Sequence, residues 1–336
     1  MMRDGRVGVA GGGEGAGPNT AGAAGVNRIA GAAGAIALAA GLAMAQPVPR
    51  FTIEALPGAS GAINNNDEVT LVVAYDASRE VGGVLDLSTG VFRALTVAMH
   101  DVALTDITDT GFVAGYVGYS SGARYIVQWT PEGKRNNLPR VFEAVTTGPF
   151  LNDSGRVVWG DGDVASTWAT GTRVWKTGSL AAVSRSMRGI TNDNMVLGMY
   201  RGQGVLAPLS GRLVSAPATD STIWNEAIEA NAHGDLLVSC AESGGLRQFI
   251  WHADAVGTDG EFELLADPAS WRIMTMGRAM NDLGDVVGAG VTPGVYIPDS
   301  MLWTAGTGYS FRELLGGAYP EGWTGFLMPV DINNRG

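Results

Sequence analysis

The sequence predicts an all-β protein, a β-propeller built from four-stranded blades, on three observations. A five-residue turn motif recurs at intervals of about 40 to 50 residues, glycine is abundant without a collagen period, and short apolar strands follow each motif. Four antiparallel strands in a unit of that length are the sequence form of a propeller blade. We expect seven blades, the last of them incomplete, and the alternative is a six-bladed ring.

The turn motif starts with an apolar residue, continues with Asn, Thr, Asp or Ser, and usually ends in glycine. Its seven copies begin at Ile63, Ile107, Leu151, Ile190, Ala230, Met280 and Ile332. Glycine at the fifth position predicts a backbone with positive φ, and the exceptions Asp67 and Asn194 are residue types that tolerate it. We assign a structural role in these turns to Asn64, Asp109, Gly111, Asp153, Gly155, Asn192, Asn194, Asn231, Gly234, Asn281, Gly284, Asn333 and Gly336.

A large apolar anchor follows each motif after about 21 to 24 residues. The tryptophans are Trp129, Trp175, Trp251 and Trp303, and Leu87 and Leu209 take the place in the first and fourth copies. Because these residues lie inside apolar strands rather than at loop tips, we expect them on the third strand, packed between blades. Glycines such as Gly115 are expected to end the second strand, and residues 309–314 to form a fourth strand.

The first 45 residues form a Gly/Ala-rich leader and signal peptide. Arg28 precedes a short apolar run, and Ala43 and Ala45 are the small residues of a cleavage site, so export is expected, with no stable membrane span after cleavage. Residues 46–336 are then a single propeller domain of a bacterial secreted or cell-surface protein. The last motif copy stops in mid-turn at Gly336, which predicts a C-terminally truncated seventh blade. In the six-bladed alternative this last strand completes or caps the first blade.

The best-formed copy, residues 280–288 followed by Trp303, reads Met-Asn-Asp-Leu-Gly-Asp-Val-Val-Gly. This pattern resembles the HAF-type bacterial extracellular repeat family, and the resemblance covers residues 51–336. The His-Ala-Phe triplet for which the family is named is absent, and only Phe249 before Trp251 retains part of it. The resemblance implies an exported, propeller-like repeat protein without an established catalytic site.

Composition excludes several kinds of chemistry. The formal net charge is −11, so a basic groove for nucleic acid is not expected. The single cysteine, Cys240, lies in an apolar run and is interpreted as a packing residue. The three histidines lack metal-binding spacing, and neither a Gly-x-Ser-x-Gly elbow nor a phosphate loop is present after the signal. We therefore assign no catalytic residue, no cofactor and no metal.

Acidic turn residues raise the question of calcium, because Asp and Asn oxygens are hard ligands. They are Asp109, Asp153, Asp193 and Asp282. Each turn offers only one or two carboxylates, and hydrogen bonding across a tight turn explains them without a metal. The expected function is a secreted, non-enzymatic propeller that binds an unknown extracellular protein or glycan. The alternatives are an extracellular polysaccharide hydrolase or lyase that uses acidic residues at the pore, and a structural surface-layer component.

Overall fold

The computed structural model shows an all-β chain whose strands form six four-stranded antiparallel sheets. It describes residues 56–335 apart from 122–123, 142–146, 162–163, 170–171, 177–185, 202, 210–213, 216–221, 243–244, 254–259, 266–275, 292–297, 318 and 320–328. The leader and signal expected in residues 1–45 lie outside this range. In each sheet the four strands are consecutive in the chain and pair in their sequence order.

The first three sheets cover residues 59–176. Sheet 1 contains β1 (Ala59–Ile63), β2 (Glu68–Ala74), β3 (Glu80–Asp86) and β4 (Val91–Ala94). Sheet 2 contains β5 (Asp101–Ile107), β6 (Val113–Gly118), β7 (Arg124–Trp129) and β8 (Arg135–Val141). Sheet 3 contains β9 (Thr147–Leu151), β10 (Val157–Asp161), β11 (Val164–Ala169) and β12 (Thr172–Lys176).

The other three sheets cover residues 189–310. Sheet 4 contains β13 (Gly189–Ile190), β14 (Met195–Tyr200), β15 (Gln203–Pro208) and β16 (Val214–Ser215). Sheet 5 contains β17 (Thr222–Ala230), β18 (Leu236–Glu242), β19 (Gly245–Ala253) and β20 (Gly260–Leu264). Sheet 6 contains β21 (Met276–Met280), β22 (Val286–Val291), β23 (Pro298–Thr304) and β24 (Thr307–Ser310), and the short helix α2 (Phe311–Leu314) follows it.

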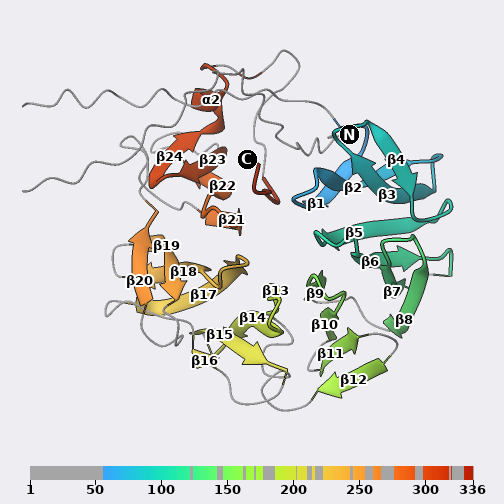
Figure 1. Cartoon of the computed structure of the whole chain (residues 1–336), viewed down its shortest axis with the longest axis horizontal. Coiled ribbons are helices and arrows are strands. Elements are labelled where there is room, and N and C mark those ends of the chain that lie inside the picture. The colour runs from blue at the N-terminus through green and yellow to red at the C-terminus, as the bar shows by residue number, and fades with distance from the viewer. Residues whose placement is uncertain are drawn as a thin grey trace, which may run out of the picture.

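The sheets stand around a common centre as the blades of a propeller, with the first strand of each innermost (Figure 1). The predicted propeller of four-stranded blades is confirmed. A seventh four-stranded sheet is absent from the described residues. Instead, the C-terminal hook, residues 329–335, lies between β21 of the sixth blade and β1 of the first (Figure 1).

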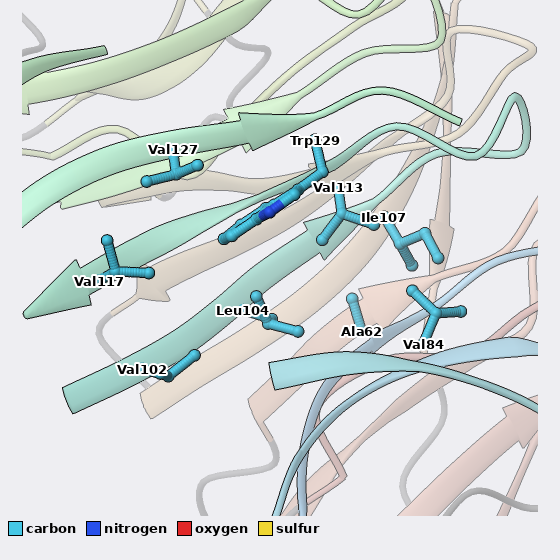
Figure 2. Close-up of a cluster of buried hydrophobic side chains, with 9 residues drawn as sticks. All are labelled: Ala62, Val84, Val102, Leu104, Ile107, Val113, Val117, Val127 and Trp129. Carbon is cyan, nitrogen blue, oxygen red and sulfur yellow. The ribbon is translucent and has the colours of Figure 1, made fainter. Parts of the chain in front are cut away.

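Apolar side chains fill the space between neighbouring blades. Figure 2 shows the cluster between blades 1 and 2, in which Ala62 and Val84 of blade 1 face seven residues of blade 2. Trp129 is fully buried there, and its indole Nε1–H donates to the backbone oxygen of Leu95 at 3.0 Å, at the end of blade 1. Period-two alternation on the strands thus places one face of each sheet against the next blade.

The anchor positions of three blades differ from the expectation. Strand register pairs the second-strand residues Val113, Leu236 and Val286 with Trp129, Trp251 and Trp303 on third strands. In the other blades the same register position holds Leu85, Trp168 and Ala207. The assignments of Leu87 and Leu209 to the anchor position, and of Trp175 to a third strand, were therefore wrong.

Hairpin length explains the errors in blades 3 and 4, whereas in blade 1 the hairpin is as long as in blade 2 and Leu85, 22 residues after Ile63, holds the position. Only two residues separate β10 from β11 in blade 3, whereas five residues separate β6 from β7 in blade 2. The third strand of blade 3 is therefore reached earlier in the sequence. Trp175 lies on the fourth strand, β12, and its side chain is outside the described residues.

Two further local expectations were wrong for identifiable reasons. Gly115 lies inside β6 and does not end it. A Cβ at this position would meet the backbone oxygen of Ala103 at 2.1 Å. Glycine therefore permits the backbones of β5 and β6 to approach closely beside the β-bulge in β5. Residues 311–314 form helix α2 instead of extending β24. Ser310 caps this helix, and Ser310 and Glu313 complete a capping box.

The fifth residue of each described turn has the left-handed backbone that glycine predicted. The φ values are 85° at Gly111, 74° at Gly155, 87° at Gly234 and 80° at Gly284. The two non-glycine positions agree, with 62° at Asp67 and 70° at Asn194. Gly336 lies outside the described residues.

Replacing Gly155 with alanine is expected to lower the free energy of unfolding by about 2 kcal/mol or more, because strain at positive φ is joined by a clash. An added Cβ would meet the Phe112 ring at 2.8 Å. Gly234→Ala is the matched control, since Gly234 holds the same turn position with nothing within 4 Å, and about 1 kcal/mol is expected there. Denaturant unfolding of both variants checks the order, and equal losses would refute the role of Phe112.

Candidate functional site

The first polar residue of each turn holds the residue four positions later by two hydrogen bonds. At Thr108, for example, the backbone N–H donates to the oxygen of Phe112 at 2.9 Å, and Oγ1 accepts the Phe112 N–H at 3.0 Å. The same pair of bonds is made by the first polar residue of the other five complete copies, Asn64, Asn152, Thr191, Asn231 and Asn281. This explains the preference for Asn and Thr at the position: both supply a short side-chain acceptor.

Hydrogen bonds also link turns of neighbouring blades. Asn64 Nδ2 donates to the oxygen of Thr108 at 3.0 Å, and Asn152 Nδ2 donates to that of Thr191 at 3.1 Å. Farther round, the Ala232 N–H donates to Asp282 Oδ1 at 2.7 Å. We call these turns at the centre of the propeller the turn ring; among the described residues blades 4 and 5 are joined there by the Arg188–Glu226 ion pair rather than by a bond from turn to turn.

The C-terminal hook closes the turn ring. Asn281 Nδ2 donates to the backbone oxygen of Asn333 at 2.9 Å, and Asn333 Nδ2 donates to that of Asn64 at 3.2 Å. The next residue, Asn334, also contacts both neighbouring turns. Its N–H donates to Asn65 Oδ1 and its Nδ2 donates to Asp282 Oδ2, both at 2.7 Å. The last copy of the motif thus occupies a seventh position between the sixth copy and the first.

Three of the acidic turn residues, Asp109, Asp153 and Asp282, are acceptors for a neighbouring turn, whereas Asp193 accepts the Thr191 hydroxyl of its own turn. Asp109 accepts the N–H and Nδ2 of Asn65, both at 2.8 Å. Asp153 accepts the N–H of Asp109 at 3.2 Å and Nδ2 of Asn192 at 2.7 Å. Among the described residues no group of three His, Cys, Asp or Glu side chains is arranged to hold a metal ion.

Replacing Asn64 with threonine is expected to cost about 1 kcal/mol of stability, because it removes one of the bonds from this turn to the next, the bond from Nδ2 to the buried Thr108 oxygen. Thr108 and Thr191 show that threonine keeps the bonds within a turn. Asn64→Ala removes the side-chain bonds within the turn as well as the bond to the next turn, and it is expected to cost at least twice as much stability. Thermal unfolding of the two variants checks this, and an unchanged midpoint for Asn64→Thr would contradict a stabilising turn ring.

Inside the turn ring lies a channel of about 610 Å³ that is lined by residues of all seven motif copies. Among the described lining residues seven are acidic, Asp106, Asp109, Asp153, Glu226, Glu229, Asp282 and Asp331, and two are basic, Arg188 and Arg278. Arg188 is already paired with Glu226, at 2.6 Å. The channel wall is therefore strongly acidic.

Three of these residues, Asp106, Glu229 and Asp331, stand at the same position of the repeat, immediately before the residue that starts the motif. We call them the channel acids. Asp106 accepts the Leu151 N–H of the next blade at 2.6 Å, and Asp331 accepts the Ile63 N–H at 2.9 Å. Glu229 accepts the Ala230 N–H at 3.2 Å. Two channel acids thus connect successive positions of the ring.

The channel acids have raised pKa values. Desolvation is the main cause in all three, and it raises the pKa of Asp106 to about 7, of Glu229 to about 8 and of Asp331 to about 6. Repulsion by the Asp331 carboxylate raises the first two further. Their hydrogen bonds to backbone N–H groups act in the opposite direction. Near neutral pH the channel therefore holds carboxyl groups that are partly protonated.

The turn motif marks residues that surround the channel, but it does not include the channel acids. The residue immediately before the motif is acidic in three of the seven copies, where it is Asp106, Glu229 or Asp331. The other four carry Ala62, Phe150, Gly189 and Ala279, so no pattern stands out. Trp129, Trp251 and Trp303 are buried between strands, away from the channel lining, and Cys240 is buried in β18. No helix among the described residues has the length and hydropathy to cross a membrane.

Comparisons with known proteins find likeness at the level of structure. No protein-family model matches the sequence, and no curated protein matches it. The β-propeller domain of the trilobed protease from Pyrococcus furiosus, described as having an open velcro topology, is 11% identical, with a TM-score of 0.51 over 81% of this chain and 86% of that one.

Two structures of acylaminoacyl peptidase are also similar. One, in complex with Z-Gly-Gly-Phe-chloromethyl ketone, is 12% identical with a TM-score of 0.53. The match covers 79% of this chain and 47% of the peptidase chain. The other, of the enzyme from Pyrococcus horikoshii, is 13% identical with a TM-score of 0.52. The match covers 79% of this chain and 46% of the peptidase chain. The chain thus spans less than half the length of these peptidases. At such identities the likeness establishes the fold alone: the chain is a β-propeller of four-stranded blades.

Proposed function

We propose that the protein is an exported, non-enzymatic propeller of the HAF-repeat type that binds an extracellular protein or glycan at the mouth of its channel. The observation that supports binding over catalysis is the engagement of the channel carboxyl groups. Asp106, Asp331 and Glu229 accept backbone N–H groups, and Glu226 is paired with Arg188. These groups are held as parts of the wall, whereas a catalytic pair needs a carboxylate free to meet the reacting atoms.

Charge favours a basic segment of a protein as the ligand. The wall carries seven acidic and two basic side chains, so it attracts Lys or Arg and repels acidic polysaccharide. Phe150 is the single aromatic side chain in the part of the lining that the structure describes, which gives a sugar ring little surface for stacking. The ligand class expected first is therefore a lysine- or arginine-bearing loop or terminus, and a neutral glycan second.

The second candidate function is an extracellular polysaccharide hydrolase or lyase, and one observation favours it. Glu229, with its pKa raised to about 8, is largely protonated at neutral pH and has the protonation state of a general acid. In this alternative Glu229→Gln abolishes turnover of a polysaccharide. In the binding proposal the full chain turns over none.

The binding proposal is tested with the full chain and a variant in which the channel acids are neutral, Asp106→Asn, Glu229→Gln and Asp331→Asn. The probe is a set of lysine-rich peptides and neutral oligosaccharides, measured by calorimetry at two salt concentrations and at about pH 9, where all three channel acids are ionised. Peptide binding by the full chain, weakened at least about tenfold in the variant and by high salt, is the expected result.

The matched control neutralises three exposed acids outside the channel, Asp76→Asn, Glu132→Gln and Glu261→Gln, and is expected to bind as the unaltered chain does. Equal weakening in both variants would assign binding to overall charge and reject the channel as the site. Release of product from an oligosaccharide by the full chain, lost in Glu229→Gln, would replace the binding proposal by the enzymatic one.

A further inference from the structure

The channel extends beyond the first strands at blade 5. Ser239 of β18 and Gln248 of β19 belong to its wall there. In the rest of the lining that the structure describes, each residue lies in a first strand, just before one, in the turn that follows, or in the C-terminal hook. We call this side opening the blade 5 recess, and its walls are Glu226, Ser239 and Gln248 of blade 5 with Gly277 and Arg278 of blade 6.

Three polar side chains form a row across blade 5 that faces blade 6. Strand register pairs Glu226 with Ser239, and Ser239 with Gln248. Two residues along the strands, the pair Leu237 and Ile250 has the same orientation and packs in an apolar cluster with residues of blade 6. The exposed fractions of the three polar residues are 8%, 5% and 2%. Polar groups in such surroundings need hydrogen-bond partners.

Gln248 has a partner for only one end of its amide. Oε1 accepts the Gly277 N–H, which identifies the other atom as the nitrogen. This Nε2 is buried and has no hydrogen-bond partner. By contrast Gln128, the other buried glutamine among the described residues, donates from Nε2 to the Gly155 oxygen and accepts from Asn136 at 3.1 Å. An acceptor brought by a ligand would therefore satisfy a donor that this chain leaves unpaired.

Arg278 adds a cation to the same recess. It is the extra residue of a β-bulge between Gly277 and Ala279, a feature that redirects a side chain, and it is exposed in the channel lining. It makes no ion pair or hydrogen bond with the described residues. Arg188, in contrast, is bound to Glu226 at 2.6 Å, which offsets the charge of the one carboxylate in the row. The recess thus offers a guanidinium and an amide N–H to an oxygen acceptor.

We propose that the blade 5 recess binds a carboxylate of the ligand, while lysine or arginine side chains of the same ligand meet the channel acids. This inference rests on the proposed binding of a basic protein segment. A guanidinium beside an amide donor suits the two oxygens of a carboxylate, and charge-assisted bonds of this kind are the strong ones. A chain terminus and an aspartate or glutamate side chain supply the same group, and the experiment distinguishes them.

The test measures fluorescence anisotropy of three N-terminally labelled, lysine-rich peptides with the full chain, at the pH of the calorimetry and low salt. The first ends in a free carboxylate, the second in an amide, and the third is an amide that contains one aspartate. The first or the third is expected to bind at least about tenfold more tightly than the second, and the tighter of the two identifies the source. Attraction to the acidic wall alone predicts the opposite order, because the second peptide carries the most positive charge.

In Arg278→Gln the preference for a carboxylate is expected to fall below about threefold, while binding through lysine remains. Gln248→Glu, which replaces the unpaired donor by an acceptor of the same shape, should lose the preference too. The matched control is Lys134→Gln, which removes a positive charge from an exposed residue outside the channel lining and should keep the preference.

Equal affinity of the unaltered chain for the three peptides, or a preference that survives in Arg278→Gln, would overturn this inference and leave the binding proposal standing. Absence of binding by all three peptides would reject the binding proposal, and this inference with it.

Discussion

Replacing Trp129 with alanine is expected to lower the free energy of unfolding by about 3–5 kcal/mol, the usual cost of emptying a buried aromatic site. The ring is fully buried between blades 1 and 2, among Val113, Val127 and Leu104 (Figure 2). The variant also loses the bond from Nε1 to the Leu95 oxygen. Calorimetric unfolding of the full chain should show a midpoint about 10 °C lower.

Two comparisons separate packing from hydrogen bonding. Trp129→Phe keeps most of the ring and loses the bond to Leu95, and is expected to cost about 1–3 kcal/mol. Tyr75→Ala, at a site 62% exposed, removes a similar ring with little expected effect. If Trp129→Ala and Tyr75→Ala shift the midpoint equally, contact between blades 1 and 2 does not determine stability.

The protein is expected to lose stability as pH rises from about 4 to about 8. The channel acids have folded-state pKa values of about 7, 8 and 6, above the ordinary 3.8 of Asp and 4.5 of Glu. A group with a raised folded pKa stabilises fully below its unfolded pKa, and that contribution is lost as pH rises through the folded value. Ionising these desolvated carboxyl groups at high pH therefore favours unfolding.

Asp106→Asn should flatten this dependence, since an amide keeps an oxygen for the Leu151 N–H and cannot ionise. At pH 8 the variant is expected to be more stable than the unaltered chain by on the order of 2 kcal/mol, and at pH 4 nearly equal. Glu261→Gln, which removes an exposed carboxylate outside the channel, serves as control. A midpoint that rises with pH, or an unchanged slope in Asp106→Asn, would contradict the account.

The sequence predicted most of the fold because turn geometry depends on local chemistry. A glycine such as Gly111 and an acceptor such as Thr108 determine φ and the hydrogen bonds of one turn, whatever lies around them. Helix α2 was missed although its capping box, Ser310 and Glu313, was readable. Anchor positions such as Ala207 could not be derived from spacing, because hairpin length varies from blade to blade and the register follows the hairpin.

The site was less predictable for a different reason. Asp106, Glu229 and Asp331 are more than 100 residues apart, and only the circular arrangement of the blades brings them to one axis. Their raised pKa values come from desolvation and mutual repulsion in the channel, which are properties of the assembled ring. For the turn aspartates the sequence favoured hydrogen bonding across a turn over a calcium role, and Asp109 and Asp153 accept hydrogen bonds from neighbouring turns.

The most direct test is whether the seventh copy of the motif closes the turn ring between the sixth blade and the first. Asn65 and Asn334 are in contact across that closure, with 2.7 Å between the Asn334 nitrogen and Asn65 Oδ1. In the double variant Asn65→Cys, Asn334→Cys, where the other cysteine, Cys240, is buried, a short bis-maleimide should link the two thiols within one chain. Mass spectrometry of the digested protein should find that link and none in either single variant. Absence of the intramolecular link, or links only between chains, would contradict a closed turn ring.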